Sequence, residues 1–284
     1  MFAVLITSAL PPPGPPPLRV ATLSSHDPTA WSNDACKVTA RGRATCNLRV
    51  YAAAAAAAAK ERAELLVVPE AYALTVSASD DDVFDTWISD VGSTPYLHGS
   101  NATSLQQVTI SRLAKENGLA IASNIFVARD GKNYITQVIF SSDGSVIGYY
   151  DKHHLFVTEL LHFHAGPFQP TVVDLHGRRL GLIICWEGFY PYVTFDWSQM
   201  EQLKREGSET FVWSIGGTSK FHVRTPDKAV GSHYAKTYNV SVVVSDVEKD
   251  GQILSSDGNG VPSVVVPLSI PTYTASATIS VATI

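Results

Sequence analysis

Three segments of this chain are apolar at every position, unlike a strand with one face in water. They are Leu65–Val68, Leu180–Ile184 and Val242–Val244. A strand of this kind is buried on both faces, so other elements must cover its sheet on each side. The chain is therefore predicted to be an α/β protein in which helices cover a sheet.

Helical segments alternate with these strands. Ala52–Ala59 is a run of eight alanines, and alanine combines the highest helix propensity with a side chain small enough to pack closely on a sheet. Ser104–Glu116 has apolar residues at helical spacing, followed by Asn117-Gly118 as a stop signal. The predicted helices are 48–64, 104–116, 200–207 and 232–238, and the predicted strands are 18–23, 65–68, 119–127, 134–141, 145–151, 171–175, 179–185, 210–215 and 240–246.

Two connections, Arg129–Asn133 and Ser142–Gly144, read as hairpin turns. Hairpins join antiparallel strands, so the sheet is predicted to be mixed and not purely parallel. The polar stretch Ser24–Cys46 is predicted to be a long surface loop. No internal repeat or second domain is visible in the sequence, and residues 18–284 are predicted to form a single domain.

The first 17 residues are set apart by their composition. Met1–Leu10 is apolar, but it lacks a basic start and is short for a signal peptide, so it is either the remnant of a leader or an unstructured apolar end. Pro11–Pro17 is a proline-rich spacer that cannot form a helix or an internal strand. No run reaches the roughly 18 apolar residues that a membrane-spanning helix needs, so no membrane span is expected.

The net charge of −5 and the lack of any Lys/Arg cluster in the sequence argue against nucleic acid as a partner. Hydrophobic residues make up 45% of the chain and charged residues 17%, as in an ordinary globular protein. The expected partner is therefore a small molecule.

The three cysteines fall into two environments. Cys36 and Cys46 lie in a polar stretch, and Cys185 ends an apolar one. This pattern suits a Cys36–Cys46 disulfide with one free thiol, although two unpaired loop cysteines are equally allowed. A disulfide weakly favours a secreted or extracytoplasmic protein, with a cytoplasmic location as the alternative. The sequons that begin at Asn101 and Asn239 are compatible with export, although the second is expected to be buried.

Charged or nucleophilic residues stand at the ends of three predicted strands. Glu70 comes two residues after Val68, Lys152 directly after Asp151, and Cys185 directly after Ile184. Enzymes of the α/β class carry their reacting groups at such strand ends. If the three ends meet, one pocket holds a carboxylate, a cation and a thiol, which predicts a thiol-dependent hydrolase.

Each of these residues also has a plainer explanation. Cys185 could be a small buried hydrophobe, Glu70 a helix cap and Lys152 a solvated loop charge. Together, however, they supply what attack on a carbonyl or nitrile carbon needs: a thiolate, a group that takes and returns a proton, and positive charge for the oxyanion. The backbone N–H of Trp186, in the turn after the thiol, is a second candidate oxyanion donor.

The motifs around these residues resemble those of the nitrilase (carbon–nitrogen hydrolase) superfamily. The resemblance rests on Val68–Glu70, Tyr150–Phe156 and Ile184–Glu187, which stand in the superfamily's order of Glu, Lys and Cys, and it runs from about Arg19 to about Val266. It implies a four-layer α-β-β-α sandwich that pairs into homo-dimers or larger homo-oligomers. It also implies catalysis without a metal or an organic cofactor.

Carried over position by position, the resemblance implies that Glu70 is the general base, Cys185 the nucleophile and Lys152 the stabiliser of the tetrahedral intermediate. The family has a second glutamate shortly after the lysine, which orients the substrate and the lysine, and Glu159 fits that place. The implied reaction is cleavage of a non-peptide amide through a cysteine thioester. Nitrile hydrolysis by the same residues is the alternative.

The branch of the superfamily, and with it the substrate, is left open by the motifs. Asp151–Phe156 together with Glu159 resembles the vanin and biotinidase branch, which hydrolyses secondary amides of vitamins. Cys185–Glu187 resembles true nitrilases and general amidases more closely. A linear or vitamin-type amide is the favoured substrate class.

Further residues are candidates for the substrate pocket. Trp213 and Gly216 belong to a glycine-containing segment where backbone or substrate can approach closely, although an ordinary glycine turn explains the glycines equally well. Tyr72 follows Glu70 closely and is a candidate for the pocket wall, with core packing as its other role.

Three rival interpretations compete with this one. His153, His154, His162 and His164 surround Glu159, but their spacing matches no standard zinc motif and the apolar residues between them favour packing, so no metal is predicted. A Cys–His thiol protease lacks any recognisable signature around Cys185. The third alternative is a non-catalytic binding module that has kept the fold.

Overall fold

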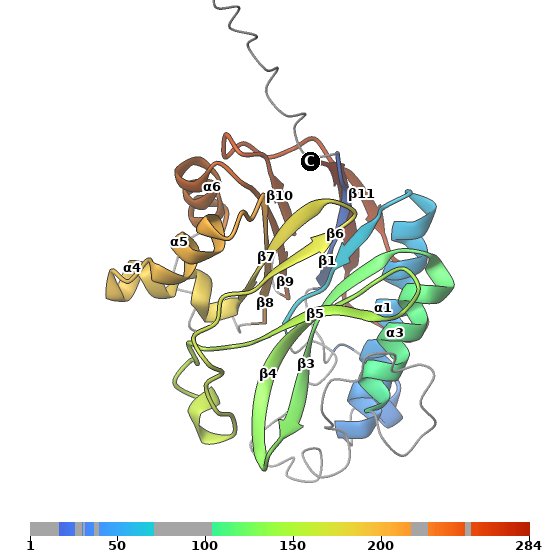
Figure 1. The fold of residues 1–284 in the computed structure, drawn as a ribbon. Coiled ribbons are helices and arrows are strands. Elements are labelled where there is room, and N and C mark those ends of the chain that lie inside the picture. The colour runs from blue at the N-terminus through green and yellow to red at the C-terminus, as the bar shows by residue number, and fades with distance from the viewer. Residues whose placement is uncertain are drawn as a thin grey trace, which may run out of the picture.

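Two sheets face each other in the computed structural model, which describes residues 17–25, 30, 32–36, 40–70, 104–216, 227–247 and 251–284 (Figure 1). The larger sheet has the strand order β11-β12-β1-β2-β3-β4-β5, made of β1 (Arg19–Ser25), β2 (Leu65–Val67), β3 (Ala120–Arg129), β4 (Lys132–Phe140), β5 (Val146–Asp151), β11 (Val264–Pro267) and β12 (Ala277–Thr283). The smaller sheet has the order β10-β9-β8-β7-β6, made of β6 (Val172–Leu175), β7 (Arg178–Ile184), β8 (Thr210–Ile215), β9 (Ser241–Asp246) and β10 (Gln252–Leu254).

Each sheet has a parallel centre and antiparallel margins. Strands β1, β2 and β3 run parallel in the larger sheet, as do β7, β8 and β9 in the smaller one. The neighbours on either side, β12 and β4 in one sheet and β10 and β6 in the other, are antiparallel. The mixed α/β class is confirmed, but the strands form two sheets where the hairpin pattern suggested one, because that pattern does not reveal which strands share a sheet.

Helices cover the outer face of each sheet, which gives four layers (Figure 1). On the larger sheet lie α1 (Ala40–Lys60) and α3 (Leu105–Asn117), and beside the smaller sheet lie α4 (Tyr190–Thr194), α5 (Ser198–Arg205) and α6 (Asp227–Tyr238). One apolar core packs α1 and α3 onto the larger sheet. The other fills the space between the sheets and continues to α5 and α6. The expected α-β-β-α sandwich is therefore confirmed.

Helix α1 begins at Ala40, and not at Leu48 as predicted, so the last part of the predicted loop is helical. Ala44 and Cys46 are both buried, Cys46 within the core that packs α1 onto the larger sheet, and this packing extends the helix beyond the alanine run. Within the run, three alanines are fully buried on the sheet, namely Ala54, Ala55 and Ala58. Small side chains thus let the helix lie close to the strands.

Local capping signals begin and end α3 as expected. The Oγ of Ser104 accepts a hydrogen bond from the Gln107 N–H at 3.2 Å, and Gly118 adopts a φ of +64° after the last turn.

After α6, Asn239 is exposed with a φ of +49°, so the prediction that this asparagine is buried is wrong; only the following Val240 is buried. The other sequon lies outside the described residues. Among the described helices, none is long and apolar enough to cross a membrane.

Polar side chains bridge the two sheets inside the core. Gln137 of β4 donates its Nε2 hydrogen to Ser214 Oγ of β8 at 3.2 Å. Ser245 of β9 donates its hydroxyl hydrogen to the Leu23 carbonyl of β1 at 2.6 Å. Both bonds are buried, where an unmade bond costs about 1–3 kcal/mol. They therefore fix the position of one sheet on the other.

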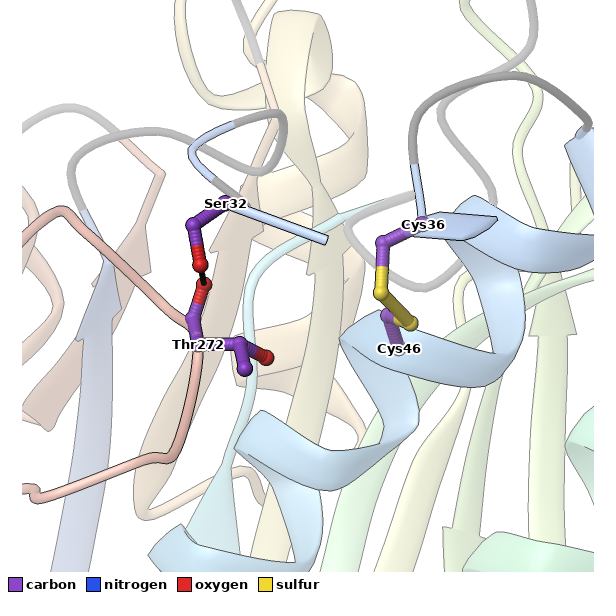
Figure 2. Close-up of a disulfide and its surroundings, with 4 residues drawn as sticks. All are labelled: Ser32, Cys36, Cys46 and Thr272. Atoms are coloured by element: carbon purple, nitrogen blue, oxygen red, sulfur yellow. Dashed lines mark hydrogen bonds between the residues drawn. A yellow bond between two sulfur atoms is a disulfide. The ribbon is translucent and has the colours of Figure 1, made fainter. Parts of the chain in front are cut away.

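A disulfide joins Cys36 of the short 3-10 helix η1 (Asp34–Cys36) to Cys46 of α1 (Figure 2). The two Cα atoms lie 5.7 Å apart. The segment before it is held from the other side, because the N–H and hydroxyl of Ser32 both donate to the Thr272 carbonyl, at 2.8 and 3.2 Å. The connection between β1 and α1 is therefore anchored to both α1 and the C-terminal part of the chain.

Removing this disulfide in the Cys36→Ala/Cys46→Ala double variant is expected to lower the free energy of unfolding by about 2–3 kcal/mol. The bridge closes a short loop with a sequence separation of 10, and its loss restores the conformational entropy of the unfolded chain. Denaturant titration without reductant measures the change. A reductant should destabilise the parent protein but not the double variant. Equal denaturation midpoints for the two proteins would contradict the prediction.

Candidate active site

The strand-end residues Glu70 and Lys152 meet in the structure. Glu70 lies shortly after β2 and Lys152 directly after β5, at opposite sides of β3 and β4. Lys152 Nζ lies 2.8 Å from Glu70 Oε1 and 2.7 Å from Glu159 Oε1. Lys152 is fully buried, so its ammonium group is held between two carboxylates and out of water.

Cys185 joins this group from the smaller sheet. It is the first residue of the 3-10 helix η4 (Cys185–Gly188), directly after β7, and it is 7% exposed. Its thiol is close enough to Glu70, Lys152 and Glu159 for all three side chains to act on its pKa. The structure therefore brings together Glu70, Lys152, Glu159 and Cys185.

The backbone at Cys185 is strained, with a φ of +43° that non-glycine residues rarely adopt. Neighbouring groups hold it there. Trp213 donates its Nε1 hydrogen to the Cys185 carbonyl at 3.0 Å, and Tyr234 donates its hydroxyl hydrogen to the Gly188 carbonyl at 2.6 Å. The turn is thus fixed by side chains of β8 and α6, which present the thiol at the strand end.

Burial and charge set the protonation states of the site. Burial raises the pKa of the Cys185 thiol, and Glu70 raises it further, although Lys152 acts in the opposite direction. Burial alone would lower the pKa of Lys152, but its electrostatic interactions with Glu70, Cys185 and Glu159 outweigh burial and raise that pKa. The resting site therefore contains an ammonium group and a protonated thiol beside a carboxylate.

Glu159 lies in the 3-10 helix η3 (Glu159–Leu161). Its Oε2 accepts a hydrogen bond from the Phe156 N–H at 2.7 Å, while Oε1 contacts Lys152. Burial raises the pKa of Glu159 and the Lys152 charge lowers it, with a net upward shift. The carboxylate is thus fixed to its own loop and to the lysine at the same time.

The candidate pocket residues lie in different places. Trp186 is partly exposed and packs edge-on against Phe156, with ring centroids 5.3 Å apart. Trp213 is fully buried and supports the Cys185 backbone from behind the turn. Gly216 lies so close to Glu70 that an added Cβ would sit 2.4 Å from the Glu70 carbonyl oxygen. Tyr72 lies outside the described residues.

The histidines near Glu159 take part in packing and hydrogen bonding. The Nδ1 of His153 lies 2.7 Å from the Gly166 carbonyl oxygen. The Nδ1 of His154 lies 3.3 Å from Gln199 Oε1, and its ring stacks on Tyr190. Within the described ranges, no cluster of His, Cys, Asp or Glu side chains is arranged to hold a metal ion.

Glu187 is a residue of the site that the sequence reasoning did not single out. It is fully buried, two residues after Cys185, and it accepts hydrogen bonds from Tyr150, His153, His154 and Ile184. Its place in the Cys185–Glu187 motif was the available signal, because bonds to backbone N–H groups leave no pattern in the sequence.

This arrangement has the components of acyl transfer. A thiol lies beside a carboxylate that can accept its proton, and an ammonium group lies beside the same carboxylate. The N–H of Trp186 belongs to the turn directly after the thiol, which makes it a candidate donor to an oxyanion. No other group is needed for a nucleophile, a base and an electrostatic stabiliser.

Comparisons with known proteins agree with this chemistry. The family model described as carbon–nitrogen hydrolase matches residues 39–202, which is more than half of the chain. Among curated proteins, the N-carbamoylputrescine amidase of Solanum tuberosum is 28% identical over 88 residues, which cover 30% of this chain and 29% of that enzyme. The nitrilase of Pyrococcus abyssi is 27% identical over 135 residues, and the match covers 47% of each protein. These matches thus span less than half of the curated relatives.

Solved structures show that the fold is shared over nearly the whole chain. An amidase of Nesterenkonia AN1 from the nitrilase superfamily superposes with a TM-score of 0.66, covering 93% of this chain and 90% of the amidase. Sequence identity over this match is 15%. The likeness is therefore one of architecture.

The Glu70→Gln variant is expected to react with iodoacetamide at Cys185 at lower pH than the parent protein does. Glu70 raises the pKa of the thiol, so its neutral replacement lowers that pKa and the thiolate forms earlier in a rising pH series. Mass spectrometry of alkylation against pH measures the shift, since Cys185 is the free cysteine. Glu209→Gln, far from the thiol, is the control and should not shift the curve. An unshifted curve, or a shift to higher pH, would contradict the prediction.

The Gly188→Ala variant is expected to disturb the cysteine turn. A Cβ at Gly188 would lie 2.2 Å from the Trp213 ring, which is itself fully buried, so the turn or the indole must move. Overpacking of this kind costs about 1–3 kcal/mol of stability. The midpoint temperature of thermal unfolding and the alkylation rate of Cys185 should both be lower than in the parent protein. Gly260→Ala serves as the comparison, since an added Cβ there meets no atom within 4 Å and its φ is not positive.

Proposed function

The chain belongs to the carbon–nitrogen hydrolase family, and on that basis we propose that it hydrolyses a small non-peptide amide through a thioester on Cys185. The observation that carries the proposal is the buried contact of Lys152 with Glu70 and Glu159 beside the thiol. The family supplies the reaction class, and this contact supplies the residues for it.

In the first step, Glu70 accepts the proton of Cys185 while the sulfur attacks the amide carbon. Glu70 is close enough to the thiol to act on its pKa, and it is the candidate acceptor for that proton. The raised pKa of the thiol means that proton transfer accompanies the attack, because little free thiolate exists beforehand. Glu70 is thus the general base of the proposal and Cys185 the nucleophile.

The tetrahedral oxyanion is stabilised by Lys152 and by the N–H of Trp186. An ammonium group has three donors, and the contacts with Glu70 and Glu159 use two of them. The third donor serves the oxyanion, and Glu159 holds the lysine in the required direction. A donor of this kind contributes about 3–4 kcal/mol to the transition state.

The intermediate then collapses, and the acid is released. Glu70 returns the proton to the leaving nitrogen, the C–N bond breaks, and the acyl group stays on Cys185 as a thioester. A water molecule that gives a proton to Glu70 attacks the thioester, and the C–S bond breaks to give the carboxylic acid. The departing thiolate takes that proton from Glu70, so the site returns to its starting state without a metal or cofactor.

The substrate class rests on the motifs and relatives. We favour a linear or vitamin-type amide, as in the vanin and biotinidase branch. Of the curated relatives, several are N-carbamoylputrescine amidases and one is a nitrilase, so nitrile hydrolysis by the same residues is the second candidate. In a solved form of the Nesterenkonia amidase, acrylamide is added at the active-site cysteine. A small electrophilic or amide ligand is therefore the appropriate probe.

Two features extend the proposal beyond the chemistry. The Cys36–Cys46 disulfide supports a secreted or extracytoplasmic location, since reducing compartments rarely preserve such bonds.

Val193 and Phe195, at the end of α4, are 62% and 82% exposed. Exposed apolar side chains of this size support self-association into a homo-dimer or larger assembly.

Thioester trapping tests the proposed function. Turnover of a panel of small amides and nitriles, quenched in acid, should leave a substrate-derived acyl group on the peptide that contains Cys185, seen by mass spectrometry. Cys185→Ser and Glu70→Gln should each lower kcat at least about 10³-fold with thermal stability retained.

The outcomes of this experiment are distinct. Turnover that survives in Cys185→Ser, or that a chelator abolishes in the parent protein, would overturn the thiol mechanism. Release of ammonia from nitriles without turnover of amides would replace the amide assignment by the nitrile one. A parent protein that neither turns over nor acquires an acyl group with any member of the panel would favour a silent binding module.

A further inference from the structure

We propose that Glu187 is a positioning residue that holds the lysine segment and the cysteine turn at one fixed separation. The proposal rests on the proposed function, because it concerns the alignment of Lys152 with Cys185. Glu187 itself lies behind the turn and is assigned no contact with the substrate.

One carboxylate receives hydrogen bonds from two sheets. Oε1 accepts from the Tyr150 hydroxyl at 2.7 Å and from the N–H groups of His153 and His154 at 2.9 and 3.2 Å. Oε2 accepts from the Ile184 N–H at 3.0 Å. Tyr150 and the two histidines belong to β5 and the loop after it, whereas Ile184 ends β7 in the other sheet.

The bonded N–H groups lie directly beside the reacting residues. His153 follows Lys152 in the chain, and Ile184 precedes Cys185. Since both segments bond to one rigid carboxyl group, a movement of either segment away from the other must break a buried charge-assisted hydrogen bond. Glu187 therefore restricts the distance between the ammonium group and the thiol.

A second layer of contacts holds the carboxylate in turn. Gln199 of α5 donates its Nε2 hydrogen to the Tyr150 hydroxyl at 3.2 Å, and its Oε1 lies 3.3 Å from His154 Nδ1. Burial and the nearby Glu187 raise the pKa of Tyr150, so the hydroxyl stays a donor at any working pH. The carboxylate thus lies in a closed set of buried contacts.

A purely local role would be that of a cap for the 3-10 helix that begins at Cys185. That role explains the bond to the Ile184 N–H, which lies three residues earlier in the same segment. It does not explain the bonds to Tyr150, His153 and His154, which come from another sheet. The two roles therefore differ in whether a change at Glu187 alters the distance between the Lys152 ammonium group and the Cys185 thiol.

The Glu187→Gln variant tests the proposal. Glutamine has nearly the same shape, but one side of its amide is a donor, so at least one of the four donors now faces another donor. Misalignment should lower kcat about 10–100-fold with KM changed less than about three-fold.

The pH dependence of Cys185 alkylation gives a readout that loss of stability alone would not move. Lys152 lowers the pKa of the thiol, so a lysine that is held less closely should shift alkylation to higher pH. Simple removal of the negative charge of Glu187 would shift it in the opposite direction. The sign of the shift therefore separates positioning from charge.

The matched control is Glu209→Gln. Glu209 Oε2 also accepts a backbone hydrogen bond, from the Arg179 N–H at 3.1 Å, but Arg179 lies near the start of β7 and Cys185 follows the end of that strand. This control should leave kcat and the alkylation curve unchanged. For Glu187→Gln, a kcat within two-fold of the parent value, or an alkylation curve that is unshifted or moved to lower pH, would overturn the proposal.

Should Glu187→Gln fail to fold, Tyr150→Phe provides a milder test, because it removes one of the four donors and keeps the carboxylate. It should lower kcat a few-fold and shift the curve to higher pH, and parent-like values would overturn the proposal. If the parent protein turns over no amide or nitrile, the proposed function fails, while the alkylation curves still decide the role of Glu187.

Discussion

A single ammonium group buried between two carboxylates determines how this protein is built around its site. Lys152 is inaccessible to water, and burial of an unpaired charge would be too costly for a fold of ordinary stability. Glu70 and Glu159 provide the compensation, at 2.8 and 2.7 Å. Glu70 follows β2, Lys152 follows β5, and Glu159 lies in the loop after β5. The charge balance therefore requires these three segments to meet at one place.

The sheet topology makes this convergence possible. Parallel strands end at the same edge, and each of the two sheets has a parallel centre that carries one of the reacting segments, after β2 in the larger and after β7 in the smaller. The thiol thus comes from one sheet and its base from the other. Glu187 and Gly216 lie at the contact between them, the first as an acceptor of four hydrogen bonds and the second as a residue without a side chain against Glu70.

The sequence predicts the parts of this site that depend on strand ends. Glu70, Lys152 and Cys185 stand out because each follows a predicted strand, and the alternation of strands and helices predicts the class of fold. The division into two sheets followed from the family resemblance and not from the strand pattern, and the early start of α1 and the support of Cys185 by Trp213 could not be predicted. These features depend on contacts between distant segments. The role of Glu187 was likewise not predicted, because three of its four hydrogen-bond donors lie more than 30 residues away in the sequence.

The buried bonds Gln137–Ser214 and Ser245–Leu23 have a consequence for how such a molecule can admit a ligand. Each joins a strand of one sheet to a strand of the other, so shearing of the layers would break both. Sliding of one sheet over the other is therefore opposed by two buried bonds. Ligand binding is expected to leave the mutual position of the two sheets unchanged.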